Sequence, residues 1–375
     1  GSMGDYSFDG TILGQHATVS DPVSGNQTWE KVISKNLGAD LNMFSNRLSL
    51  TADFYIRDTK GILGKGKSLP SIYGANEPQV NSNNLRTKGY ELVLGWRDSF
   101  KLAGSTFSYG ITGTFSDYTA EYTKCDNPSG LIGGPYVGKK YGEIWGYKVD
   151  GLFRNDEEAA EYASRVDLSK VAAGYYSATG AYGKGVRGGD IKYLDLNGDG
   201  VVDSYDVKPI GYTSIPEIVY GFGFSLQWKA FDFSAFFQGV GHVNFSTRTD
   251  QTQGFIARNS REANLFSDVY DNYWTPERLD AKYPRLFIGT NNNNNQNSSF
   301  WMANGRYMRL KNLEIGYTLP KHISQKMAMQ NMRVYLSGVN LFTFSPFKLW
   351  DPDLQTGATN YPNNRIINIG LTIGF

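Results

Sequence analysis

The stretch IVYGFGFSLQWKAFDFSAFFQGVG, residues 218–241, decides the fold because its side chains alternate between two chemical characters. Successive side chains of a β-strand point to opposite faces, so each half of this stretch predicts a strand with one apolar and one polar face. The dipeptide Lys229-Ala230 between the halves is short enough for a tight turn. The predicted apolar face holds Phe222, Phe224, Leu226, Phe233 and Phe237, and the predicted polar face holds Ser225, Asp232, Ser234 and Gln238.

The same alternation recurs along the chain and predicts about ten strands, joined in turn by short and long connections. A β-sandwich would alternate in the same way, but it has no reason to place every long connection at one end. Transmembrane β-barrels do so, with short periplasmic turns and long extracellular loops. We therefore predict an all-β fold, an antiparallel transmembrane β-barrel with long extracellular loops. The strands are predicted at 1–9, 28–43, 46–60, 85–98, 105–121, 216–229, 231–247, 305–319, 332–345 and 365–375, and the long loops at 10–27, 61–84, 122–215, 248–304 and 346–364.

Two of the predicted strands have particular features. In RYMRLKNLEIGY (306–317) the apolar phase slips between Leu310 and Leu313, which predicts a β-bulge or a rim segment. The last residues, IINIGLTIGF (366–375), alternate without a break up to Phe375. A final strand that ends on phenylalanine is the form in which outer-membrane barrels present themselves for assembly, although an ordinary last strand would have the same pattern.

Charge, cysteine content and motifs exclude several classes of protein. The 37 Lys and Arg residues nearly balance the 36 Asp and Glu residues, so the basic excess of a nucleic-acid binder is missing. Cys125 is the single cysteine, which rules out an internal disulfide and a thiolate metal cluster. The carboxylates at 156–158 lie in a polar, helix-like stretch, and no other pair suggests acid–base chemistry, so we predict no enzyme activity. The opening GSM is interpreted as native sequence or as an expression scar.

Several segments, in a fixed order, carry a family resemblance. They are LSLTADFYIRDTKGIL (48–63), TKGYELVLGWRD (87–98), YGEIWGYKVDGLF (141–153), GDIKYLDLNGDGVVDSYDVKPIGYTSIPEIVYGFGFSLQWKAFDFSAFFQGVG (189–241), RYMRLKNLEIGYTLP (306–320), RVYLSGVNLFTFSPF (333–347) and the closing YPNNR and IGLTIGF (361–375). Together they resemble the C-terminal barrel half of SusC/RagA-type TonB-dependent outer-membrane transporters, over essentially the whole chain. Asp351-Pro352-Asp353 stands where that family carries Asp-Pro-Glu.

The resemblance implies a place and a role for the chain. It implies about ten C-terminal strands of a 22-stranded barrel in the outer membrane of a Gram-negative bacterium, with the plug domain and first barrel half absent from this sequence. It also implies import of oligosaccharides or peptides with a SusD-like surface lipoprotein, energised by the TonB complex through the missing N-terminal region. Two alternatives stay open: a self-contained, calcium-stabilised β-barrel or sandwich that acts as a surface binding module or adhesin, and a secreted glycan-processing enzyme.

The stretch DLNGDGVVDSYD (195–206), inside the predicted loop 122–215, has the spacing of an EF-hand calcium loop. Such loops bind calcium through positions 1, 3, 5, 7, 9 and 12 and turn sharply at a glycine in position 6, which is Gly200 here. Aspartate in position 12 is shorter than the usual glutamate and predicts a weak site of the extracellular kind. A polar turn without an ion is the alternative interpretation. The predicted ligands of one Ca²⁺ ion are Asp195, Asn197, Asp199, the carbonyl of Val201, Asp203 and Asp206.

The predicted loop 248–304 contains two further features. The tract TNNNNNQNSSF (290–300) is low in complexity and predicts a mobile loop tip, with sugar binding by its asparagines as the minority alternative. The stretch DVYDNYWTPERLDAKYPRLF (268–287) gathers aromatic rings, which can stack on the faces of sugars or pack the loop. Tyr273 and Trp274 are the candidate ligand-binding residues of this stretch.

Overall fold

The computed structural model describes most of the chain, namely residues 3–8, 11–17, 23–25, 27–65, 78–127, 134–172, 176–177, 185–249, 252, 265–287 and 289–375. The chain divides into two compact units. The first comprises Gly1–Leu37, Tyr55–Gly89 and Thr119–Tyr141, and the second comprises Gly38–Phe54, Tyr90–Tyr118 and Gly142–Phe375. No helix in these described ranges is both long enough and apolar enough to cross a membrane.

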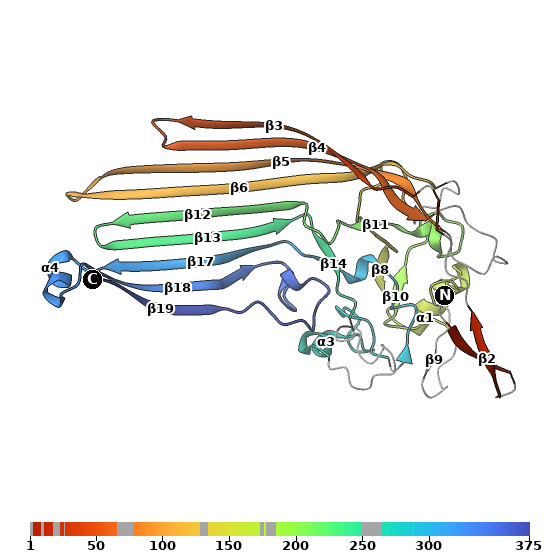
Figure 1. Ribbon diagram of the computed structural model, residues 1–375. Helices are drawn as coiled ribbons and strands as arrows, with labels where there is room; N and C mark the ends of the chain where they lie inside the picture. The colour runs from red at the N-terminus through yellow and green to blue at the C-terminus, as the bar shows by residue number, and fades with distance from the viewer. Residues whose placement is uncertain are drawn as a thin grey trace. The chain divides into compact units, whose positions relative to one another are not determined.

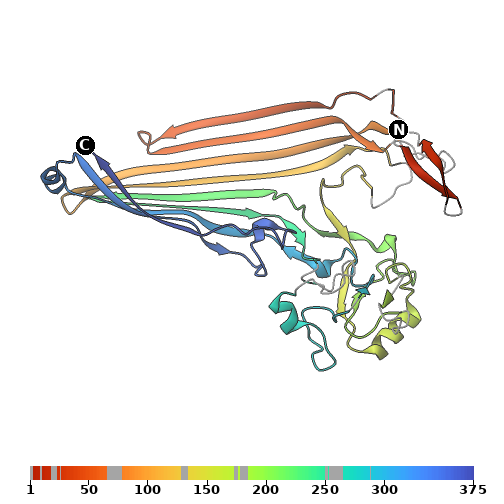
Figure 2. The same cartoon turned by 60° about the horizontal axis from the view of Figure 1, so that its bottom comes forward.

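Nine strands of the described part form one large sheet, whose order is β19-β18-β17-β13-β12-β6-β5-β4-β3 (Figure 1). The pairs from β6 to β19 are all antiparallel. The short turns of the second unit lie at one end of these strands (Figure 2). The predicted antiparallel all-β fold is therefore confirmed. The strands are β3 (Lys31–Met43), β4 (Leu48–Lys65), β5 (Gln79–Leu102), β6 (Ser105–Lys124), β12 (Ile218–Trp228), β13 (Phe231–Gly241), β17 (Tyr307–Thr318), β18 (Asn331–Phe344) and β19 (Ile366–Gly374).

The register of these pairs places the apolar residues of neighbouring strands on one face. Side chains directly opposite each other in a sheet share a face, so the pairing tests the predicted alternation across strands as well as along them. The apolar pairs include Ile111–Phe224, Phe222–Phe237, Leu226–Phe233, Phe233–Ile315, Ile315–Leu336 and Leu336–Ile369, and the polar pairs include Ser225–Ser234, Ser234–Glu314, Glu314–Ser337 and Ser337–Asn368. The predicted apolar and polar sets of 218–241 are confirmed.

Phe236 is an aromatic residue on the polar face, and its ring lies close to two glycines of β12, Gly223 opposite it and Gly221 opposite Gln238. A Cβ atom added to Gly221 would lie 2.9 Å from the Phe236 ring, and one added to Gly223 would lie 3.3 Å from it. The glycines of the sequence GFG (221–223) have no side chains, so the Phe236 ring can pack directly on the backbone of the neighbouring strand.

Aromatic residues stand at two levels on the apolar face. In β12, Tyr220 and Trp228 are eight positions apart, and in β6 their partners Phe115 and Phe107 repeat the spacing. Eight residues of strand rise roughly 26 Å, and the tilt of barrel strands makes the height across a membrane somewhat smaller. An apolar band about 25 Å tall between two aromatic girdles is the outer surface of a transmembrane barrel.

The predicted irregularity in 306–317 is confirmed as a bulge. Phe236 of β13 lies opposite Asn312, but the next residue, Phe237, lies opposite Leu310, so Lys311 is the extra residue. The pairing of β17 with β18 breaks at the same place, where Asn340 takes a positive φ of 54°.

The prediction for the first 27 residues is wrong in one respect. Met3–Phe8 is a strand, β1, as expected, but it pairs with β2 (Thr11–Ala17) in a sheet of its own. The predicted loop 10–27 therefore contains the partner strand. Only two residues separate β1 from β2, so their local pairing forms a hairpin at little cost in loop closure. Elsewhere in the first unit, Arg86 Nε donates to Asp58 Oδ1 at 2.7 Å and ties β5 to β4.

The predicted loops 122–215 and 248–304 are folded rather than irregular, and in the second unit they lie at the opposite end of the strands from the short turns (Figure 2). Their elements are β7 (Ile144–Gly146), β8 (Val149–Leu152), α1 (Asp156–Arg165), β9 (Tyr176–Ser177), β10 (Ile191–Tyr193), η2 (Ser204–Asp206), β11 (Lys208–Gly211), α3 (Ser267–Asn272), β15 (Gly289–Thr290), η3 (Ser299–Trp301) and β16 (Met302–Asn304). The predicted strand 231–247 is divided, because β13 ends at Gly241 and β14 (Asn244–Ser246) pairs with β16.

Candidate functional site

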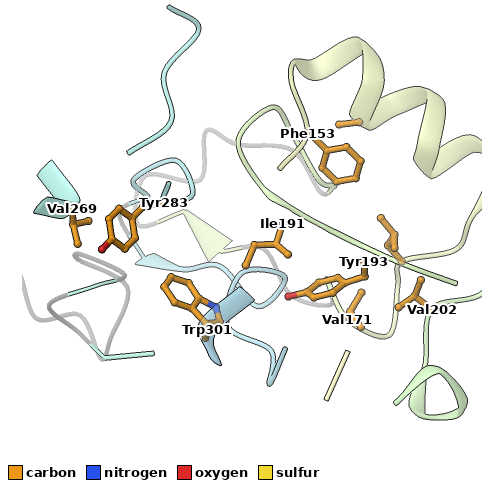
Figure 3. Close-up of a cluster of buried hydrophobic side chains, with 10 residues drawn as sticks. Phe153, Val171, Ile191, Tyr193, Val202, Val269, Tyr283 and Trp301 are labelled. Atoms are coloured by element: carbon orange, nitrogen blue, oxygen red, sulfur yellow. The ribbon is translucent and has the colours of Figure 1, made fainter. Parts of the chain in front are cut away.

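Residues of the two longest connections share one buried core, and we call the structure built on it, the described residues of 144–211 and 265–304, the loop module. Figure 3 shows the labelled side chains of this core, which come from two separate segments of the sequence, 153–202 and 269–301. A core of this kind holds the two connections together, so the loop module can present a fixed surface. Its buried members are Phe153, Ala159, Leu168, Val171, Ile191, Tyr193, Val202, Val269, Tyr283 and Trp301.

Helix α1 of the loop module begins with a capping arrangement that the sequence RNDEEAAEYASRV encodes. Asn155 Oδ1 accepts from the Glu158 backbone N at 2.9 Å, and Glu158 Oε2 accepts from the Arg154 backbone N at 2.7 Å. Acidic residues in the first turn also complement the helix dipole. The helix-like stretch predicted here is confirmed, and it packs on the core through Ala159, which is fully buried.

The asparagine tract lies inside the loop module, so the prediction of a mobile loop tip is wrong. Asn291 and Asn293 are 0% exposed and Asn294 is 1% exposed. Asn294 Oδ1 accepts from the Ile191 backbone N at 2.8 Å, and Asn293 Nδ2 donates to the Ile191 carbonyl at 2.8 Å. Each amide offers donors and an acceptor on a short side chain, and the tract therefore satisfies backbone groups that the core would otherwise bury unpaired.

A buried carboxylate explains why several asparagines are needed together. Asp190 is 0% exposed, and its oxygens accept from Asn291 Nδ2 at 2.9 Å and Asn294 Nδ2 at 3.0 Å. Arg285 Nε donates to Asp190 Oδ1 at 2.8 Å, which completes a buried ion pair. A charge is tolerated in a protein interior only when it is both paired and hydrogen-bonded. Sequence reasoning missed this site because Asp190 is separated from its partners by about a hundred residues.

The two candidate ligand-binding aromatics take part in packing. A Cβ atom on Gly189, whose φ is +81°, would lie 2.5 Å from the Trp274 ring, so this ring lies directly on the backbone there. Tyr273 packs against the buried core. Tyr270, whose ring centroid is 6.3 Å from that of Tyr273, is 65% exposed and is the ring of this stretch most open to solvent.

A short ionic contact fixes the same stretch. Asp268 Oδ2 accepts from Lys282 Nζ at 2.5 Å and from Tyr283 Oη at 2.6 Å. The hydrogen bond from Lys282, followed by that from Tyr283, holds the pKa of Asp268 below its ordinary value. Burial raises the pKa of Tyr283, so its hydroxyl stays protonated and remains a donor.

The predicted calcium loop folds back on itself. Asp206, in position 12, is fully buried, and its Oδ1 accepts from the backbone N of Leu196 at 2.8 Å and of Asn197 at 3.3 Å. The first and last predicted ligand positions are therefore close together. The turn between them uses Gly198 and Gly200, with φ of +76° and +82°, a region that glycine enters without strain.

The predicted ligand side chains are engaged in backbone hydrogen bonds. Asp195 accepts from the backbone N of Gly198 at 2.7 Å and of Gly200 at 2.8 Å, and Asp199 Oδ1 accepts from the Val201 backbone N at 2.9 Å. Within the part of the chain that the structure describes, no three His, Cys, Asp or Glu side chains converge as a metal ion requires. The donor chemistry and spacing fit calcium, whereas the side-chain placement is that of a closed polar turn.

The polar face of the sheet contains an open pocket of about 900 Å³ near the short turns. Four of its five charged lining residues are paired across strands, and Arg97 is the fifth. Arg333 Nη2 donates to Asp232 Oδ2 at 2.5 Å and to Glu314 Oε1 at 2.6 Å, and Arg47 Nη1 lies 3.3 Å from Asp98 Oδ2. The wall of the pocket is thus polar but close to neutral.

The Asp351-Pro352-Asp353 segment fastens the connection 346–364 to β17. Arg309 is 2% exposed, and its Nη2 donates to Asp351 Oδ1 at 2.5 Å. Asp353 Oδ1 accepts from Tyr307 Oη at 2.9 Å. Both aspartates of the segment therefore bind side chains of one strand.

The two-faced sheet and the folded loop module match known proteins. No family model matches the chain. It is similar over its whole length to the TonB-dependent receptor P3 of Formosa agariphila, with 27% identity over 403 residues. It is also similar, over 93% of its length, to the TonB-dependent receptor SusC of Bacteroides thetaiotaomicron, with 24% identity. The chain is thus similar, over nearly its whole length, to TonB-dependent receptors. It spans 36% and 32% of the lengths of these relatives, about a third of each.

Solved structures show the same fold. The RagAB peptide transporter matches with a TM-score of 0.67 and 20% identity, over 100% of this chain and 38% of that chain. The RagAB peptide importer in its closed-closed state matches with a TM-score of 0.67 and 19% identity. TonB-dependent receptors are outer-membrane β-barrels of Gram-negative bacteria, and the predicted location of this receptor homologue is confirmed.

The asparagine network predicts a specific effect of one substitution. Asn294→Ala removes the acceptor for the Ile191 amide and a donor to Asp190, each of which stays buried. An unsatisfied buried group costs about 1–3 kcal/mol, so the loop module should open more often. Hydrogen exchange of the peptide that contains Ile191 should accelerate at least tenfold. Asn297→Ala, which truncates an exposed side chain of the same tract, is the control, and equal exchange in both variants would contradict the network.

Proposed function

We propose that this chain forms part of the wall of an outer-membrane transporter that imports a nutrient in a TonB-dependent manner. The observation that carries the proposal is the similarity of the whole chain to proteins named TonB-dependent receptors. The chain spans about a third of the lengths of these relatives. In this proposal the wall is part of a larger protein, and that protein carries out the energy-coupling step. The chain supplies strands, a polar inner face and the loop module.

The nutrient in this proposal is an oligosaccharide or a peptide. The related structure of RagAB is that of a peptide transporter, and the related SusC is a TonB-dependent receptor. The polar face supports a neutral, hydrogen-bonding cargo, because Arg333 and Arg47 are each already paired with carboxylates. A wall of paired charges exerts little net field and does not trap a polar solute by one strong ionic contact.

A SusD-like surface lipoprotein is the proposed partner at the loop module. The buried core and the asparagine network of the loop module support this role. A surface that is already ordered loses less conformational entropy when a partner binds. Tyr205 and Tyr270 are 63% and 65% exposed on this module. Exposed tyrosines supply contact area at low entropy cost and are enriched at protein interfaces.

The loop module also favours a second candidate, a surface-binding module or adhesin that does not transport. A folded extracellular structure with its own core is what an adhesin requires. The two candidates differ in the fate of the bound molecule, since only a transporter moves it across the membrane.

Uptake by intact cells tests the proposal. Cells that carry the gene and cells from which it is deleted are given labelled oligosaccharides and, separately, labelled peptides. A transporter should accumulate one class inside only the gene-carrying cells, and a protonophore should abolish accumulation because TonB-dependent transport uses the proton-motive force. Label that remains at the surface and is released by external protease would instead support the adhesin.

We further propose that the turn at 195–206 binds one calcium ion weakly. Two observations support this: every ligand position holds an oxygen donor, and Asp206 closes the loop onto positions 2 and 3. A carboxylate oxygen has two acceptor lone pairs, so an accepted backbone N–H leaves room for a metal. When bound, the ion would reduce the repulsion among the four neighbouring carboxylates and stiffen this part of the loop module.

Calorimetric titration of the purified protein with calcium measures this proposal directly. Heat should saturate in the range of roughly 10⁻⁴–10⁻³ M that is typical of extracellular sites. Asp199→Ala removes a central ligand and should abolish that heat, whereas Asp280→Ala, an exposed carboxylate outside the loop, should leave it unchanged. If no calcium-dependent heat is measured up to about 10 mM, above the extracellular range, the stretch is a polar turn that binds no calcium.

A further inference from the structure

The connection between β17 and β18 differs from the other short turns of the second unit. It runs from residue 319 to 330 and contains α4 (Lys321–Ser324) and η4 (Gln325–Met327), whereas two residues join β5 to β6 and two join β12 to β13. Figure 1 shows α4 beyond the ends of β17 and β18, at the end where the short turns lie. We call residues 319–330 together with Lys229 the turn-end rim.

The turn-end rim is basic and apolar at once. Lys321, His322 and Lys326 are exposed, and the sequence contains no Asp or Glu from residue 315 to residue 350. Ile323 and Met327 are also exposed, by 40% and 50%. Exposure of these apolar side chains to water is unfavourable. The segment is therefore suited to a surface that buries apolar groups and carries negative charge beside them.

Lys229 adds a further positive charge next to this segment. The Thr318 backbone N donates to the Ala230 carbonyl at 2.8 Å, which fixes the β12–β13 turn against the start of the rim. Lys229 is held above the ring of Trp228, with its Nζ 4.5 Å from the ring centroid. Tryptophan is enriched at the interface between lipid and water, so this contact marks the level of the headgroups.

Among the residues that the structure describes, the lysines of the rim form no ion pairs. In the described ranges, two arginines near this end are paired with carboxylates, Arg333 with Asp232 and Glu314 and Arg47 with Asp98. Lys229, Lys321 and Lys326 make no ion pair with any described carboxylate. Their charge is available to an external anion.

We propose that the turn-end rim binds the headgroup of an anionic phospholipid in the membrane leaflet that the short turns face. Lys229, Lys321 and Lys326 would contact the phosphate, while Ile323 and Met327 enter the acyl boundary. A lipid is favoured over a free phosphate because the rim continues the apolar, aromatic outer face through Trp228, Phe231 and Tyr317, whose last two rings are 4.8 Å apart. The inference rests on the membrane location and the lipid-facing surface, and does not depend on which nutrient is imported.

Native mass spectrometry of the protein, purified in a neutral detergent, tests the proposal. Phosphatidylglycerol and phosphatidylcholine of equal chain length are titrated separately. Each lysine near an anionic headgroup contributes enough to change the affinity by roughly fivefold. The triple variant Lys229→Gln, Lys321→Gln and Lys326→Gln should therefore lose at least about tenfold in affinity for phosphatidylglycerol and change little toward phosphatidylcholine.

A matched variant and a competitor complete the experiment. Lys148→Gln, Lys170→Gln and Lys348→Gln together remove three exposed lysines from the connections at the other end of the strands and should leave phosphatidylglycerol binding unchanged. Equal affinity for the two lipids, or equal loss in both triple variants, would overturn the proposal. Displacement of the lipid by millimolar inorganic phosphate would overturn it as well, because the site would then recognise free phosphate. The lipid-binding experiment does not measure transport, so a failure of the proposed nutrient uptake would leave its result unchanged.

Discussion

The structure depends on one constraint: a strand that crosses hydrocarbon must pair its whole backbone with neighbours and turn only apolar side chains outward. The period of two along each strand meets the second requirement, and the antiparallel pairing from β6 to β19 meets the first, with a register shift at the bulge in β17. The bulge at Lys311 keeps both conditions, because it returns Leu310 and Leu313 to the apolar face on either side of one extra residue.

Sequence reasoning succeeded where the information is local. The alternation around Phe224 and Ser225 and the phase slip between Leu310 and Leu313 can each be seen within a dozen residues. It failed at the asparagine tract and at the hairpin of β1 and β2. The asparagines are ordered by Asp190, about a hundred residues earlier, and composition carries no sign of that partner. The pairings of Arg333 and Arg309 were hidden for the same reason, since their carboxylates lie on other strands or in a distant connection.

The loop module shows how long connections can be rigid without many regular elements. The backbone N–H and C=O groups buried in a small apolar core must be hydrogen-bonded. Here the short strands leave some of these groups unpaired, and amide side chains hydrogen-bond to them. Asn293 and Asn294 close both backbone groups of Ile191, and Arg285 neutralises Asp190. The closed turn at 195–206 follows the same principle, with carboxylates that accept backbone N–H groups. A partner lipoprotein or a cargo that binds this surface would therefore bind an already ordered structure.

The most direct test of the account places one charge on each face of the same strand. Phe224 lies four residues from both Tyr220 and Trp228, midway between the two aromatic levels, and Ser225 points to the polar face. The free energy of unfolding is measured by denaturant titration of the protein in phospholipid vesicles. Phe224→Arg should lower it by about 2–4 kcal/mol, and Ser225→Arg should lower it much less. Equal losses in the two variants would contradict a sheet with one face toward lipid.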